Sequence, residues 1–100
     1  MVIKNDVTMK IKEGYLLREI AGNTIVVPVG EACLDFNGMI NLNESGAFLW
    51  KILENGADAK TLLNELVSNY DVSEQQAKND IENIINELYS AGVLDVKQND

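Results

Sequence analysis

The side chains that usually carry out catalysis are scarce in this sequence. It contains no histidine and one cysteine, Cys33, so it lacks both an imidazole base and the two thiols of a disulfide. One thiol without imidazoles cannot form a structural zinc site. There is no glycine-rich phosphate loop, and Glu13, Glu19 and Asp35 are not spaced like an acid–base pair. The sequence therefore predicts no enzyme activity, no metal and no cofactor.

A short strand of residues Met39–Leu42 is the first candidate binding element. The Asn37-Gly38 dipeptide before it is the strongest short signal for a two-residue hairpin turn, and Asn43 after it stands where a helix N-cap belongs. A strand edge presents main-chain N–H and C=O groups with which a guest strand can pair. Alternation places Ile40 and Leu42 on the core side of this strand and Met39 and Asn41 on the other.

The helix predicted over Glu74–Ser90 is the second candidate element. A capping box of Ser73 and Gln76 begins it, and Gly92 follows its end. Its apolar stripe is wider than one packing face needs, because Ile85 and Tyr89 lie beside the other apolar positions. We expect a groove at this helix, lined by Ile81, Ile85 and Tyr89, with Lys78 and Glu82 at its rim. Core packing produces the same pattern, so a core position for Ile85 and Tyr89 stays open.

The elements that would position these residues form a small sheet and a helical part. We expect a mobile lead-in or marginal strand over residues 1–13, a hairpin turning at Gly22-Asn23, and an extended segment over Ala32–Phe36. Pro28 must lie at an edge, a bulge or the exit of its strand. Two further helices are predicted, one from about Glu44 to Asn55 and one that starts near Asp58, a suitable cap, and ends near Asn69-Tyr70. A short extended tail is predicted at 93–96.

These elements predict an α+β fold with a winged helix-turn-helix-like arrangement. An N-terminal three-stranded antiparallel sheet is followed by three helices, and the length of 100 residues suits a single domain over 1–100. The fold class alone does not determine function.

The charge distribution argues against nucleic acid as a partner. The chain carries a net charge of −8, and residues 71–100 contribute −5 of it with seven acidic and two basic residues. A winged-helix DNA-binding regulator is an alternative function, but it needs a basic recognition helix, and residues 74–90 contain one base, Lys78, against four acids. No apolar run approaches the roughly 20 residues of a membrane span. We expect a cytoplasmic protein without a signal peptide or membrane contact.

Several segments, in this order, resemble the PqqD-like family, whose members are called RiPP recognition elements. The Leu-Asn-x-x-Gly-x-x-x-Trp core that begins at Leu42 is the most specific part of the resemblance. The similarity covers roughly Gly14–Val96. The matching segments are Leu16–Asn23, Leu42–Trp50, Tyr70–Ser73, Asp80–Leu88 and Gly92–Leu94.

The resemblance implies a non-catalytic adaptor for a peptide. Such domains hold the leader segment of a ribosomally made precursor peptide and present its core to a modifying enzyme, often a radical S-adenosylmethionine protein. In the family, the leader adds as a strand beside the third strand of the sheet, in a groove closed by the third helix. Those elements correspond here to Met39–Leu42 and Glu74–Ser90, and the acidic helix favours a leader with basic residues.

A purely structural or dimerisation domain remains an alternative to the adaptor. An exposed strand edge also allows two copies to pair, so a homodimer is compatible with either function. The sequence does not identify the precursor or the receiving enzyme.

Overall fold

The computed structural model describes residues 7–35 and 40–98. The predicted α+β class, with a three-stranded antiparallel sheet before the main helices, is confirmed. The elements in chain order are β1 (Val7–Ile11), β2 (Tyr15–Ile20), β3 (Asn23–Pro28), α1 (Ala32–Asp35), β4 (Ile40–Leu42), α2 (Glu44–Leu53), α3 (Ala59–Asn69), α4 (Glu74–Ser90) and β5 (Leu94–Gln98).

The three-stranded sheet has the order β2-β3-β4, and both pairs are antiparallel. The turn between β2 and β3 is Ala21-Gly22, because Ile20 and Asn23 already pair with each other. The predicted turn at Gly22-Asn23 is therefore wrong by one residue. Ala21 and Gly22 both have positive φ angles, 52° and 84°, as a type I′ turn requires.

A short helix, α1, replaces the extended segment predicted over Ala32–Phe36. That prediction is wrong because the chain coils directly after β3: the Cys33 N–H donates to Gly30 O at 3.2 Å and the Leu34 N–H to Glu31 O at 3.0 Å. Pro28 is the last residue of β3, which is the strand exit. The predicted Asn37-Gly38 turn and Met39 lie outside the described residues.

A second sheet of two strands joins the two ends of the described chain. β1 and β5 pair antiparallel from Val7↔Gln98 to Ile11↔Leu94. The prediction of a mobile lead-in is wrong for residues 7–11, where the alternative, a strand, is correct. Met9 is only 1% exposed and bonds to Ala57 through both main-chain groups, at 2.8 and 2.9 Å. The extended tail predicted at 93–96 is confirmed as part of β5.

The three longer helices begin at the predicted caps. The side chains of Asn43, Asp58 and Ser73 each accept a hydrogen bond from the backbone N–H three residues ahead, at 2.8, 2.8 and 3.1 Å. Each cap satisfies one of the free N–H groups of a helix start. The helix starts could therefore be predicted from local sequence alone.

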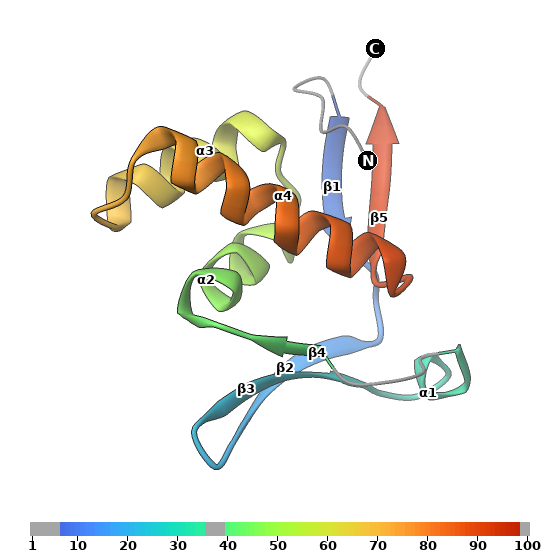
Figure 1. The fold of residues 1–100 in the computed structure, drawn as a ribbon. Coiled ribbons are helices and arrows are strands. Elements are labelled where there is room, and N and C mark those ends of the chain that lie inside the picture. Colours follow the sequence, from blue (N-terminus) through green and yellow to red (C-terminus); the bar gives the residue numbers. More distant parts are fainter. Residues whose placement is uncertain (1–6, 36–39, 99–100) are drawn as a thin grey trace.

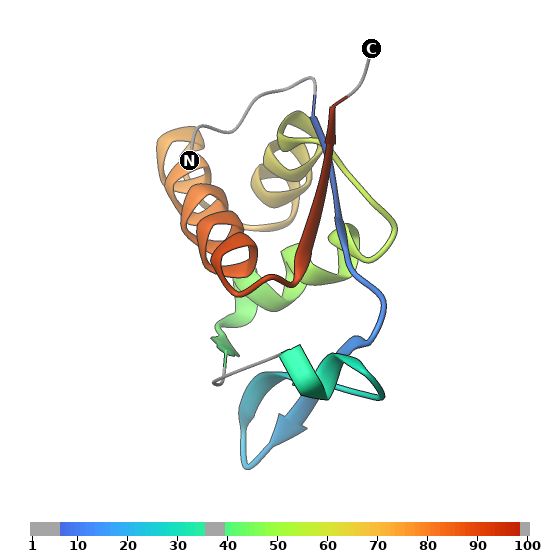
Figure 2. The same ribbon diagram turned by 90° about the vertical axis from the view of Figure 1, so that its right-hand side faces the viewer.

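The core lies between the helices and the two sheets. α2 lies between the three-stranded sheet on one side and α3 with α4 on the other, while β1 and β5 run alongside the helices (Figure 1, Figure 2). Trp50, Leu49 and Leu53 of α2 are fully buried at the centre, together with Leu62 of α3 and Ile85 of α4. β4 and α4 both pack against α2, so this helix sets their relative position.

Candidate functional site

The Leu-Asn-x-x-Gly-x-x-x-Trp motif fixes the end of β4 to the start of α2. Leu42 is buried in the core, and Asn43 caps α2 by accepting the Gly46 N–H at 2.8 Å. A Cβ on residue 46 would lie 3.0 Å from the same Asn43 oxygen and 3.4 Å from Leu42 Cβ, so glycine fits there best. Trp50, one turn later, is completely buried. The motif is therefore a rigid corner that sets the position of the strand edge.

The hairpin register determines which main-chain groups of β3 face β2. Residues that flank a two-residue turn, here Ile20 and Asn23, form a hydrogen-bonded pair, and bonded and non-bonded pairs then alternate along the strands. Every second residue from Asn23 onward therefore points its N–H and C=O toward β2. The bond from Val29 N–H to Gly14 O at 2.7 Å, beyond the strand end, follows the same alternation.

The intervening residues of β3 point their main-chain groups toward β4. Thr24 pairs with Leu42 and Val26 with Ile40, so these two residues of β4 bond to β3. Asn41, between them, must then point its N–H and C=O away from β3. β4 is the last strand of the sheet among the described residues, so both groups of Asn41 face an open edge. One residue of an antiparallel guest strand could exchange two hydrogen bonds with Asn41 there.

A hollow of about 260 Å³ adjoins this edge and is closed on its far side by α4. We call it the β4–α4 groove. Asn41, Leu42 and the first turn of α2 form one wall. Residues three, four and seven positions apart on one face of α4 form the other, namely Asp80, Asn83, Ile84 and Glu87. An extended chain beside β4 would therefore contact both elements.

The structure places the described strand residues of the predicted site as expected. Ile40 and Leu42 are buried at 6% and 7% exposure, and Asn41 is exposed on the opposite face. Asn41 and Leu42 both line the groove, whereas Ile40 does not. Met39, the fourth predicted strand residue, lies outside the described residues.

The predicted helix residues do not line the groove. Ile81 and Ile85 are 3% and 0% exposed and belong to the core, which was the alternative for Ile85. Lys78, Glu82 and Tyr89 are exposed, and the helical repeat of 3.6 residues puts them on the side of α4 opposite Asp80 and Glu87. The structure thus brings the strand of the predicted site to α4, but to another face of that helix.

Sequence reasoning missed Asp80, Asn83, Ile84 and Glu87. Their spacing was readable as one helical face, but it is a mostly polar face, which looks like ordinary solvent-exposed surface. Ile84, at 8% exposure, belongs to the buried core as well, so its apolar character alone does not indicate a groove. Recognising this face as a groove wall needs the position of β4 relative to α4, which is a tertiary fact.

The side chains on α4 differ in how they are paired. Lys78 lies 3.4 Å from Glu74, and both are exposed, so this ion pair contributes little to stability. Asp80 accepts a hydrogen bond from Gln76 Nε2 at 2.9 Å.

Across residues 7–35 and 40–98, no group of histidine, cysteine or acidic side chains is arranged to hold a metal ion. Within the same ranges, no helix has the length and apolarity to cross a membrane.

Comparison with known families agrees with the motif and the fold. Residues 15–94 match the family described as coenzyme PQQ synthesis protein D (PqqD). The chain belongs to the PqqD family. The resemblance seen in the sequence is thereby confirmed over most of the chain. No curated protein matches the chain in sequence.

Two solved structures share the fold of this PqqD-family chain. One is TbiB1 in complex with the TbiA(beta) leader peptide, with a TM-score of 0.65 and 16% identity over 86% of this chain and 94% of the other. The second is lasso peptide synthetase B1 complexed with the leader peptide, with the same score and identity, covering 86% and 95% of the two chains. At this identity the likeness establishes the fold.

Proposed function

We propose that this PqqD-family chain is a non-catalytic adaptor that binds the leader segment of a ribosomally synthesised precursor peptide. The leader adds as a strand to the open edge of β4 and lies in the β4–α4 groove. The observation that carries this proposal is the outward-facing main chain of Asn41 beside the groove. The two structural neighbours are themselves complexes with leader peptides, which supports the same use of the fold here.

The role of the domain is presentation of its guest to a modifying enzyme, which we propose to be a radical S-adenosylmethionine protein. Main-chain pairing supplies affinity with little dependence on sequence, while the groove side chains select the register. Ordering a flexible leader costs roughly 2–5 kcal/mol of the gross interaction. The resulting moderate affinity suits a guest that must be handed on.

The first test is an amide chemical-shift titration of the labelled domain with the leader segment of any short precursor peptide found to be encoded next to the gene of this chain. We expect the largest shifts at Ile40–Asn43 and on the Asp80–Glu87 face of α4. Shifts confined to other elements would contradict the site, and no shift at all would contradict leader binding.

A second test separates strand addition from other contacts. In an antiparallel pairing the guest residue opposite Asn41 donates its own N–H, so methylating that single amide nitrogen should weaken binding by about tenfold, the value of one lost hydrogen bond. The matched control is N-methylation of the next residue, whose N–H points away from β4 in this antiparallel pairing. Equal effects along the whole peptide would contradict strand addition.

Self-association through the same edge is the competing use of β4. Exposed strand edges template pairing with any compatible chain, including a second copy. Sedimentation measured with and without the leader distinguishes the two, because a leader that occupies β4 must dissociate a dimer formed through that edge.

A further inference from the structure

The lining of the β4–α4 groove carries negative charge without a compensating base. Asp80 and Glu87 stand on either side of Ile84 on α4, and none of the described lining residues is a lysine or arginine. We propose that the groove selects an extended peptide with basic side chains on either side of an apolar one. This inference rests on the proposed function and specifies the peptide class that the groove accepts.

The alternation of a guest strand determines which of its side chains would meet α4. A guest residue opposite Asn41 shares the face of Asn41, which is opposite the core side of the sheet. Its two neighbours in sequence share the face of Ile40 and Leu42. Alternate guest residues therefore point to the side where the helices lie, toward the α4 wall.

The spacing along α4 agrees with an alternating peptide. Asp80 and Glu87 are seven residues apart, which is about 10 Å along a helix axis. Guest side chains four residues apart are separated by about 13 Å along a strand. Lysine and arginine side chains are long and flexible enough to cover the difference. The central side chain, two residues from each, then faces the apolar Ile84.

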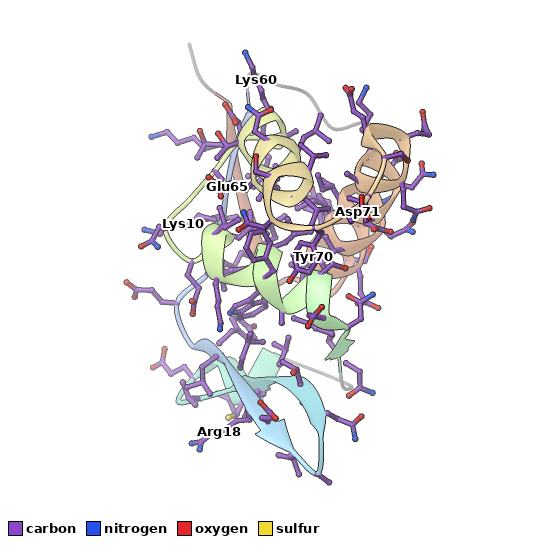
Figure 3. The ribbon with its side chains drawn as sticks, turned by 90° about the vertical axis from the view of Figure 1, so that its left-hand side faces the viewer. Lys10, Arg18, Lys60, Glu65, Tyr70 and Asp71 are labelled. Atoms are coloured by element: carbon purple, nitrogen blue, oxygen red, sulfur yellow. The ribbon has the colours of Figure 1, made fainter. Side chains whose placement is uncertain are left out.

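Among residues 7–35 and 40–98, no lysine or arginine lines the β4–α4 groove itself. Lys10 and Arg18 project from the side of the molecule away from α4, and Lys60 from the start of α3 (Figure 3). Lys78 is on α4 but is paired with Glu74 and lies on the face opposite the groove. A basic guest side chain would therefore approach Asp80 and Glu87 without repulsion from a lysine or arginine in the groove wall.

The experiment uses three blocked heptapeptides, Thr-Xaa-Thr-Leu-Thr-Xaa-Thr, in which Xaa is lysine, glutamine or glutamate. Each is titrated into the labelled full chain, and amide shifts give both the site and the affinity. We expect the lysine peptide to bind more tightly than the glutamine peptide by about two- to fivefold for each charge, as for solvent-exposed ion pairs. The glutamate peptide should bind most weakly, and added salt should reduce the differences.

Variants of α4 assign this preference to the groove. The double substitution Asp80→Asn with Glu87→Gln should abolish the lysine preference, and the asparagine keeps an acceptor for Gln76. Glu82→Gln is the matched control, because it removes one acid from the opposite face of the same helix. Equal loss in the control would mean that overall charge, and not the groove, sets the preference, which would overturn the inference.

The outcomes separate this inference from the proposed function. If all three peptides bind at β4 and α4 with equal affinity, the basic specificity is wrong while strand addition stands. If none of the peptides shifts an amide of β4 or α4, both proposals fail for this groove.

Discussion

The side chain of Asn43 and the main chain of Gly46 are fitted to each other at the corner between β4 and α2. The Gly46 N–H donates to Asn43 Oδ1 at 2.8 Å, and a Cβ on residue 46 would lie 3.0 Å from that same oxygen. The Asn43 oxygen thus needs residue 46 both as a donor and without a side chain, which gives a physical reason for asparagine and glycine occurring together in the motif. The open edge of β4 begins directly before this corner.

This coupling predicts a specific double-mutant result. Asn43→Ala removes the cap and should destabilise the fold by about 1 kcal/mol. Gly46→Ala should also destabilise the wild type, because the clash with the Asn43 oxygen outweighs the gain of up to about 1 kcal/mol in helix propensity. In the Asn43→Ala background the clash is relieved, so the same substitution should cost less. Urea unfolding of the four proteins measures the coupling, and strictly additive effects would contradict it.

Asp58 predicts a small pH dependence of stability. Hydrogen bonds from Thr61, through its side chain and then its backbone N–H, lower the pKa of Asp58 below its ordinary value of 3.8. The charged cap therefore stabilises the fold above that pH, and its contribution is lost as the pH falls through the folded-state pKa. The effect is small because the carboxylate is exposed to solvent.

The substitution Asp58→Asn isolates this effect. Asparagine is an equally good cap but does not titrate. The stability of the wild type relative to the variant should therefore fall between neutral pH and about pH 2, as measured by urea unfolding at both values. An unchanged difference would show that the cap charge does not contribute.

Two adjacent isoleucines on α4 distinguish the groove from the core. Both are buried in the core, but Ile84 keeps 8% exposure and lines the groove, whereas Ile85 is 0% exposed and does not line it. Each substitution by valine removes one methylene group, worth about 0.8 kcal/mol of burial. Ile84→Val should weaken leader binding by up to about twofold, because only its 8% exposed surface is left to bury on binding. Ile85→Val should leave the affinity unchanged and cost about 0.5–1.5 kcal/mol of stability. Calorimetric binding and thermal unfolding of both variants provide the check, and a reversed pattern of affinities would refute the assignment.

Met9 tests the second sheet. Its side chain is 1% exposed, so Met9→Ala should destabilise the fold by about 2–5 kcal/mol. Lys10→Ala is the matched control on the same strand, since Lys10 is exposed and should have little effect. Thermal unfolding followed by the buried Trp50 fluorescence measures both. A mild effect at Met9 would mean that β1 is only loosely attached.

Local signals in the sequence predicted the helix starts and the three-stranded sheet. Caps such as Asn43 and Ser73 act within three residues, so the sequence contains their whole interaction. The hairpin was recognised from its β-branched strand, although its turn was placed one residue late. Asn41 and Leu42, two of the strand residues predicted to bind a peptide, line the β4–α4 groove.

Contacts between segments far apart in the sequence could not be predicted from local sequence patterns. β1 pairs with β5, although most of the chain separates them in sequence. The alternation of Val7, Met9 and Ile11 indicates a strand but does not identify its partner at residues 94–98. The difference between the predicted helix residues and those that line the groove has the same origin. The prediction was based on apolar residues of α4, but Ile81 and Ile85 are buried in the core. The groove is lined instead by polar residues such as Asp80 and Glu87.

The pairing of β1 with β5 also places the two ends of the described chain side by side. Val7 and Gln98 are direct partners, on the side of the helices away from the three-stranded sheet (Figure 1). A short linker could join these positions, and new termini opened at the exposed Ala21-Gly22 turn would be a circular permutant, a change tolerated where chain ends lie close together. A second protein fused after Gln98 or before Val7 would start from nearly the same point. Under the function proposed above, such fusions at the end of the molecule away from the three-stranded sheet would be a way to bring a bound peptide to a chosen enzyme.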